Sequence, residues 1–198
     1  GDLNLSDVTS PEGLELPDKV TGRLNLYSLT SAEGLTFPKH VGGGLNLDGL
    51  TSVKGLKLPE HVGGYLSLDG LTSAEGLKLP EHVGGYYTSR PYTNGNLSLD
   101  GLTSAEGVTF PEHVGGWLNL SGLTSAEGLT CPEHVGGELD LSGLTTVEGL
   151  KLPKHVGGDL HLWGLDPDDY DQEVHGPAEL GGKVYFSEED WDDAPPPT

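Results

Sequence analysis

The chain repeats a 21-residue motif along most of its length. The pattern Leu-x-Leu begins at eight positions, and each step between them is 21 residues except for one step of 31. These positions are Leu3, Leu24, Leu45, Leu66, Leu97, Leu118, Leu139 and Leu160. A degenerate ninth copy, GGKVYF, begins its strand at Val184. A fixed period of about 20 to 30 residues, with apolar positions locked to it, predicts a solenoid.

One repeat can be assigned to local structure from its residue types. Apolar and polar residues alternate over 24–26 and again over 35–37, which predicts two short strands in each coil. Between them, residues 30–34 (TSAEG) have the T-x-x-E spacing of a capping box before a Gly, which predicts one short helical or 3₁₀ turn. The pair Gly42-Gly43 predicts a tight return. The expected fold is all-β with short helical turns: a single-domain parallel β-solenoid of about eight to nine coils.

Stacked coils place identical positions about 4.8 Å apart, the spacing of neighbouring strands. The predicted inward columns are Leu24/Leu45/Leu66, Leu26/Leu47/Leu68, Leu29/Leu50/Leu71, Leu35/Leu56/Leu77, Phe37/Leu58/Leu79 and Val41/Val62/Val83. Cys131 belongs to the Phe37 column, so we expect a buried thiol that acts as a small hydrophobic residue. No coil can bury its apolar face alone, and stability is therefore expected from stacking on neighbours.

The run L-T-S-A-E-G-L-x-L-P-E-H-V-G-G-x-L-x-L resembles the short leucine-rich-repeat-like solenoids of bacteria and phages. The resemblance covers about residues 2–163. It differs from standard leucine-rich repeats because no Asn follows the L-x-L strand, where Asp48, Asp69 and Asp100 or Ser121 and Ser142 stand instead. A curved horseshoe and a straighter β-helix therefore both remain open. The resemblance implies an interaction scaffold and no particular ligand.

The charge balance limits the classes of partner. With 31 acidic and 10 basic residues, the formal net charge is −21, which argues against direct binding to nucleic-acid phosphates or to an anionic membrane surface. No apolar stretch reaches the ~18 residues needed to span a bilayer, so we expect no membrane insertion. Catalytic signatures are also missing, since there is no G-x-S-x-G elbow and no phosphate-cradling loop with a Lys. We therefore expect a protein that is not an enzyme and that uses no cofactor.

Histidine occupies one position of the repeat and should form a ladder. Its members are His40, His61, His82, His113, His134 and His155. The ladder could bind metal or sense pH, or it could consist of corner residues copied with the repeat. No carboxylate or thiol lies at ligand spacing within the motif, so no metal site is predicted. Protonation below about pH 6 would add like charges, which predicts lower stability there.

Two surface columns suggest alternative functions. Carboxylates recur at Asp48, Asp69 and Asp100 and beside the His ladder, so an acidic rod could imitate a nucleic-acid duplex and occupy a nucleic-acid-binding protein. The competing explanation is that the charge keeps the rod soluble. Thr30 and its repeats form a column that suggests a self-assembling or ice-binding rod, although helix capping also explains them.

The two ends of the repeat array differ. Residues 164–198 replace the motif with an acidic segment, which we interpret as a C-terminal cap followed by an acidic tail. Four aromatic residues, Trp163, Tyr170, Phe186 and Trp191, are expected to cover the last Leu rung. An acidic docking tail is the functional alternative. The N-terminal coil shows no comparable cap, which predicts that a segment precedes it, or that this end meets a partner or associates end to end with another copy.

The single irregular step contains ten extra residues, assigned here to an insertion loop at 87–96 within the solenoid of residues 1–163. Tyr65 and Trp117 flank this insertion on one outward column. The predicted partner-binding residues are Tyr65, Tyr86, Tyr87, Arg90, Tyr92 and Trp117. Tyr, Trp and Arg are enriched at binding hot spots. The sequence therefore predicts a non-catalytic scaffold for a protein partner, or a structural part of a larger assembly, although a tolerated loop is the simpler alternative.

Overall fold

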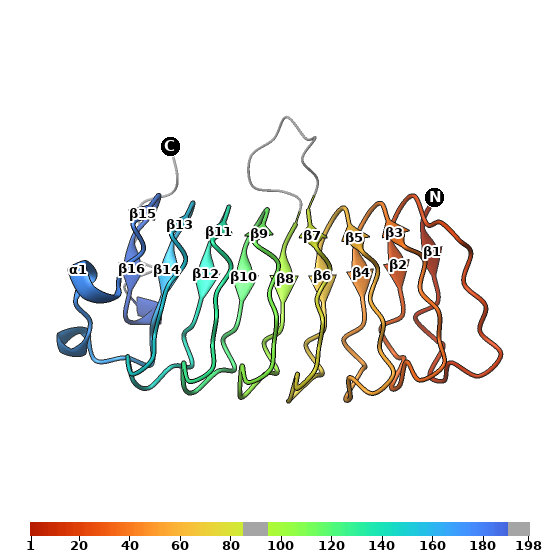
Figure 1. The fold of residues 1–198 in the computed structure, drawn as a ribbon, viewed down its shortest axis with the longest axis horizontal. Coiled ribbons are helices and arrows are strands. Elements are labelled where there is room, and N and C mark those ends of the chain that lie inside the picture. The colour runs from red at the N-terminus through yellow and green to blue at the C-terminus, as the bar shows by residue number, and fades with distance from the viewer. Residues whose placement is uncertain (85–94, 190–198) are drawn as a thin grey trace.

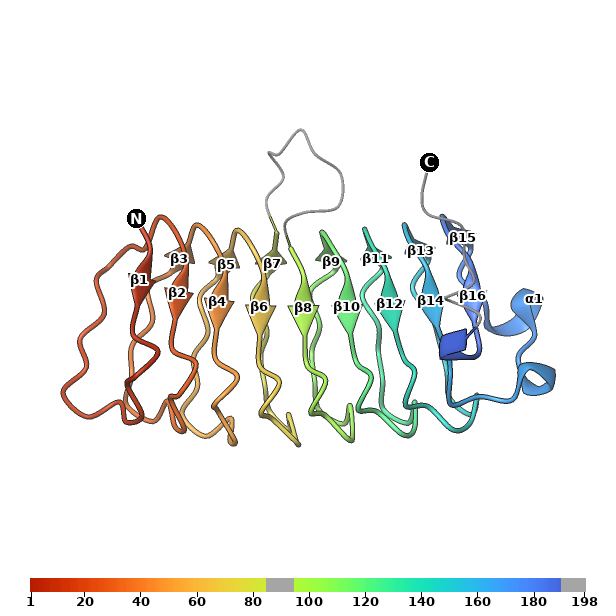
Figure 2. The same ribbon diagram turned by 180° about the vertical axis from the view of Figure 1, so that it is seen from behind.

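The computed structural model, which describes residues 1–84 and 95–189, is a rod of stacked coils (Figure 1). Two parallel sheets run along the rod, one of nine strands and one of seven. The coils follow one another in chain order from the N-terminal end to the helical C-terminal end, as the view from behind also shows (Figure 2). The predicted parallel β-solenoid is therefore confirmed.

The nine-stranded sheet, called sheet A here, is built from the Leu-x-Leu segments. Its strands are β1 (Leu3–Asn4), β2 (Leu24–Asn25), β4 (Leu45–Asn46), β6 (Leu66–Ser67), β8 (Leu97–Ser98), β10 (Leu118–Asn119), β12 (Leu139–Asp140), β14 (Leu160–His161) and β16 (Val184–Tyr185). Each strand pairs in parallel with the same position of the next coil, as Leu24 does with Leu45. Strict register follows because a slip would move the buried Leu columns out of the core.

The seven-stranded sheet B is built from the His-Val segments. Its strands are β3 (His40–Val41), β5 (His61–Val62), β7 (His82–Val83), β9 (His113–Val114), β11 (His134–Val135), β13 (His155–Val156) and β15 (Glu179–Leu180). The prediction of a second strand at 35–37 and its repeats is wrong, since among the described residues that segment forms only a bridge between Lys78 and Thr109. Alternating side chains indicate extended backbone, but they do not indicate which part of it pairs with the next coil.

The predicted helical turn within each coil is also wrong. The Leu35 N–H donates to the Ala32 carbonyl at 3.1 Å, which closes a β-turn, and Gly34 has φ +82°, as the third residue of a type II turn requires. Ser31 Oγ accepts from the Glu33 N–H at 3.2 Å. Thr30 does not cap this turn, because its hydroxyl donates to the Thr9 carbonyl of the preceding coil at 3.1 Å.

The core matches the predicted columns. In the second coil Leu24, Leu26 and Leu29 are fully buried, and Leu35, Phe37 and Val41 are buried as well. Of the predicted inward residues in the next coil, Leu56 and Leu58 are only partly buried. Cys131 was expected to be buried; it packs against the core but is only partly buried, and desolvation of its thiol raises the pKa to about 12.

The C-terminal coil is completed by β15, which pairs with β13, and by β16, which pairs with β14. The described helical elements, η1 (Pro167–Asp169) and α1 (Gln172–His175), lie in this region. Tyr170 and Phe186 pack against the core, with ring centroids 5.5 Å apart, and the assignment of residues 164–198 to a cap and tail stays a prediction. Trp191 lies outside the described residues, and Trp163 lies on the outer side of sheet A. Within residues 1–84 and 95–189, no helix has the length and hydropathy of a membrane span.

The insertion leaves the coils on either side in register. Leu66 pairs with Leu97, and Gly95 accepts from the Gly116 N–H at 3.2 Å, as Gly22 does from the Gly43 N–H three coils earlier. Gly95 and Asn96 therefore hold ordinary coil positions. The residues added to the repeat are 85–94 rather than the predicted 87–96, and they lie outside the described residues.

Candidate functional site

The residue before each sheet A strand points outward and forms what we call the pre-strand column. Its members are Asp2, Arg23, Gly44, Tyr65, Asn96, Trp117, Glu138, Asp159 and Lys183. The carbonyl of each member after Asp2 accepts from a strand residue of the preceding coil, as Trp117 does from the Leu97 N–H at 2.9 Å. This regular backbone ladder holds the column's side chains on one face of the rod.

Tyr65 shows how this column arranges an aromatic residue. Gly44 precedes it in the column, and a Cβ on Gly44 would lie only 2.3 Å from the Tyr65 ring, so the ring occupies the space that Gly44 leaves. The Arg23 guanidinium lies over the same ring, 5.4 Å from its centroid. This is a cation–π contact that spans two coils.

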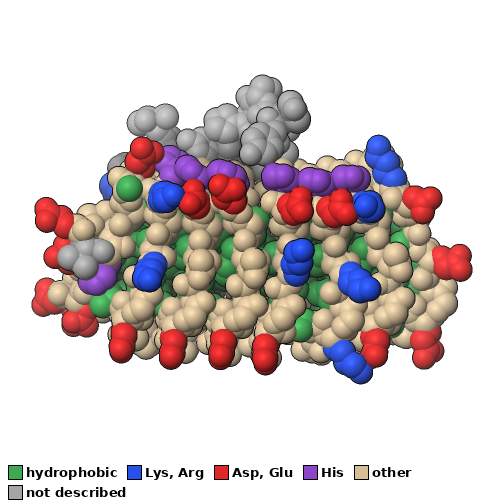
Figure 3. Space-filling model, in the orientation of Figure 1, with side chains coloured by type: hydrophobic (Ala, Val, Ile, Leu, Met, Phe, Trp, Pro, Cys, Tyr) green, Lys and Arg blue, Asp and Glu red, His purple; other side chains and the backbone are tan. Residues whose placement is uncertain are grey.

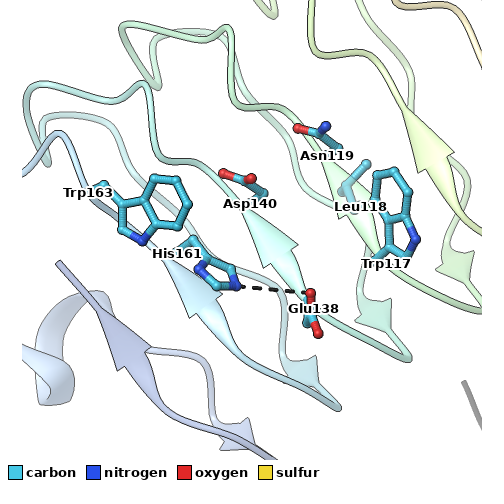
Figure 4. Close-up of a pocket in the computed structure, with 7 residues that line it drawn as sticks. All are labelled: Trp117, Leu118, Asn119, Glu138, Asp140, His161 and Trp163. Carbon is cyan, nitrogen blue, oxygen red and sulfur yellow. Dashed lines mark ion pairs between the residues drawn. The ribbon is translucent and has the colours of Figure 1, made fainter. Parts of the chain in front are cut away.

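Trp117 occupies the same column further along the rod. The residue is 36% exposed, and its backbone N–H donates to Asn96 Oδ1 at 3.1 Å. It forms one end of an open hollow of about 280 Å³ on the outer surface of sheet A. The lining residues of this Trp117 hollow are Trp117, Leu118, Asn119, Glu138, Asp140, His161 and Trp163 (Figure 4).

The hollow has an indole at each end and carboxylates between them. Figure 4 shows Trp117 and Trp163 on opposite sides, with Asp140 and Glu138 in the space between. The Ser142 N–H donates to Asp140 Oδ1 at 2.9 Å and so fixes that carboxylate. Glu138 Oε2 lies 4.0 Å from His161 Nε2. The arrangement combines two flat apolar surfaces with two negatively charged hydrogen-bond acceptors.

Packed aromatic rings make the C-terminal wall of the hollow. His161 is 5% exposed, and its ring stacks on Tyr185 with centroids 5.6 Å apart. The Trp163 indole meets His161 edge-on, at 5.4 Å and an interplanar angle of 88°. Trp163 therefore packs on the outer side of sheet A. It does not cover the last Leu rung, contrary to the prediction.

Only part of the predicted partner-binding set can be located. Tyr65 and Trp117 lie on one outward column as predicted, whereas Tyr86, Tyr87, Arg90 and Tyr92 lie outside the described residues. Reasoning from sequence missed Asp140 and His161. A signal was present, because the middle residue of Leu-x-Leu is Asn or Ser in six earlier coils and then changes to Asp140, His161 and Tyr185.

The histidine ladder forms along one edge of the rod, where Figure 3 shows it as a purple row. Ring centroids are 4.8 Å apart between His40 and His61 and 5.0 Å apart between His61 and His82, and both pairs are stacked. In the described part of the chain, no three or more His, Cys, Asp or Glu side chains are grouped to hold a metal ion. A role in pH sensing stays a prediction.

The acidic surface is interrupted by lysines. Lys39 pairs with Glu60 at 3.0 Å, and Lys154 pairs with Glu133 at 2.7 Å. The two lysines lower the pKa of Glu60 and of Glu133 by hydrogen bonding and charge. The carboxylates beside the His ladder are therefore partly neutralised.

A second acidic column lies on sheet A at Asp48, Asp69 and Asp100. The Ser67 hydroxyl donates to Asp48 Oδ1 and also lies 3.2 Å from Asp69 Oδ2. Desolvation, together with the charges of Asp69, Asp48 and Asp140, raises the pKa of Asp100. These aspartates are thus linked to one another within the sheet surface.

Comparison of the chain with protein-family models, with curated proteins and with solved structures finds no match. The resemblance to leucine-rich-repeat-like solenoids therefore rests on the motif alone. Any function has to be argued from the surface of this rod.

Proposed function

We propose that this chain is a non-catalytic scaffold that binds a protein partner through the outer surface of sheet A. The contact surface would centre on Trp117 and its hollow and extend to Tyr65 and to the insertion. The scaffold would serve as an interaction module or as a structural part of a larger assembly.

The exposure of Trp117 carries the proposal. Among the described residues, the large apolar side chains that are exposed are Tyr27 and Trp117, while the Leu columns beneath are fully buried. An exposed indole on a rigid surface is a typical anchor of a protein interface. Its backbone position is set by the sheet A ladder and by Asn96, so little conformational entropy would be lost on binding.

The acidic-decoy alternative has less support, because lysines pair with the carboxylates of Glu60 and Glu133. The ice-binding alternative is also weaker. The hydroxyls of Thr30, Thr103 and Thr145 donate to carbonyls of the preceding coil, so these donors are already used within the rod.

A quantitative pull-down tests the proposal. The tagged chain would be compared with Trp117→Ala and with a triple variant in which Tyr87, Arg90 and Tyr92 become Ala. Both variants should capture less of the protein partner, and Glu127→Gln, on another surface of the rod, should capture as much as the wild type. Unchanged capture by both Ala variants would refute the proposal. Loss of capture only after neutralisation of the Asp and Glu columns would favour the decoy.

A further inference from the structure

We propose that the Trp117 hollow binds an arginine side chain presented by a basic segment of the partner protein. This inference rests on the proposed function, since it names the chemistry of the partner that the scaffold would hold.

The molecule contains its own example of the contact. In the pre-strand column, the Arg23 guanidinium lies 5.4 Å from the centroid of the Tyr65 ring. Trp117 holds the equivalent position two coils further along, and its indole is the aromatic ring that attracts cations most strongly. Among the cations of residues 1–84 and 95–189, Arg23 alone lies over an aromatic ring. A cation for Trp117 would therefore come from outside the described chain.

Two carboxylates lie where they can accept hydrogen bonds from a guanidinium stacked on Trp117. Glu138 follows Trp117 in the same column, and Asp140 lies beside it in the floor of the hollow (Figure 4). The Ser142 N–H already holds Asp140 Oδ1, so this carboxylate is oriented before a ligand arrives. The net charge of −21 adds a long-range attraction for a basic segment.

Arginine fits this site better than lysine. A guanidinium is planar, so it can stack on an indole while its N–H groups donate to carboxylates at its edge. An ammonium is a compact point charge and is more strongly hydrated. A neutral sugar could stack on the indoles but would leave both negative charges unused.

Peptide titrations test the proposal on the intact chain. A synthetic Arg-containing basic peptide would be compared with one carrying Lys instead and with one carrying citrulline, the neutral isostere of Arg, by calorimetry. The Arg peptide should bind most tightly, and the citrulline peptide should bind at least about tenfold more weakly, because charge-assisted hydrogen bonds are lost. Equal affinity of the Arg and citrulline peptides would overturn the proposal, as would stronger binding of a neutral oligosaccharide.

The repeat itself supplies variants that should fold. Asn occupies the Asp140 position at Asn46 and Asn119, and each accepts the same backbone N–H two residues on, so Asp140→Asn keeps that bond. Glu138→Gln changes an exposed position. Each variant should weaken binding of the Arg peptide by about tenfold, as should Trp117→Ala. The control Glu127→Gln makes the same charge change outside the hollow, and an effect as large as that of Glu138→Gln would overturn the site.

One further variant distinguishes an arginine of the partner from Arg90 of the chain itself as the occupant of the hollow. Arg90→Ala should leave the affinity for the Arg peptide unchanged. Binding that occurs only in Arg90→Ala would mean that the chain fills its own hollow, and the proposal would be wrong. The scaffold proposal would survive a failure of these titrations if a partner were still captured in a Trp117-dependent manner.

Discussion

The stability lost when a core leucine is shortened should depend on how many neighbouring coils it contacts. Leu120 is fully buried between Leu99 and Leu141, which hold the same position in adjacent coils. Leu5 holds that position in the first coil, where the described chain supplies a neighbour only on the side of Leu26, and it is only partly buried. A quasi-one-dimensional rod is stabilised by nearest-neighbour contacts alone.

The magnitudes follow from the atoms removed. Leu→Ala deletes the carbon atoms beyond Cβ, at about 0.8 kcal/mol for each buried methylene-sized group, and a cavity adds to this loss. We therefore expect Leu120→Ala to lower the free energy of unfolding by about 3 kcal/mol. Leu5→Ala should cost about half as much, because one of the two coil contacts is missing.

Urea unfolding followed by circular dichroism measures both variants in the 198-residue chain. The slope of the free energy with urea should be unchanged for Leu120→Ala if the rod still unfolds as one unit. Equal losses for the two variants would refute the nearest-neighbour reasoning.

Three more predictions concern turns, charge and the thiol. A Cβ on Gly34 would contact no neighbouring atom, so Gly34→Ala should lower the free energy of unfolding by about 1 kcal/mol through its positive φ alone. Gly49→Ala should lower the free energy of unfolding by more, since its Cβ would lie 2.4 Å from the Tyr27 carbonyl oxygen. Thermal melts of both variants would check this, and an equal loss would contradict it. Because the pKa of Asp100 is raised in the folded state, the wild type loses stability as the pH rises through that folded pKa. Asp100→Asn should thus be more stable than the wild type at pH 7, by no more than about 0.5 kcal/mol for this exposed group. Near pH 3 the two proteins should be equally stable. A stability gain that persists at pH 3 would contradict the electrostatic cause. With the thiol pKa raised to about 12, Cys131 should react with a thiol reagent at pH 8 only after denaturant is added, and fast labelling of the folded chain would refute its burial.

The period and the apolar columns were predictable because a buried column must recur at the same place in every coil. Val41 and its repeats were placed correctly for that reason. The pairing segment of the second strand was not predictable from alternation, since residues 35–37 alternate in the same way and form no strand. The T-x-x-E spacing suggested a helical turn, but Gly34 at positive φ closes a β-turn there instead.

The candidate site was harder to predict than the fold. Trp117 was identified because it stands on an outward column beside the insertion. Asp140 and His161 were missed because each differs from the repeat at a single position, and their proximity to Trp117 and Trp163 arises only when the coils stack. Departures from a repeat, read column by column, would have indicated this surface.

Site-specific photo-crosslinking most directly tests whether the Trp117 surface is the contact surface. A photoreactive residue would be placed at position 119, which lines the hollow beside Trp117, and, as a control, at position 127. We expect crosslinks from position 119 to one protein, competed by the Arg peptide, and none from position 127. Crosslinking of that protein from position 127 alone, or equally from both positions, would contradict this expectation.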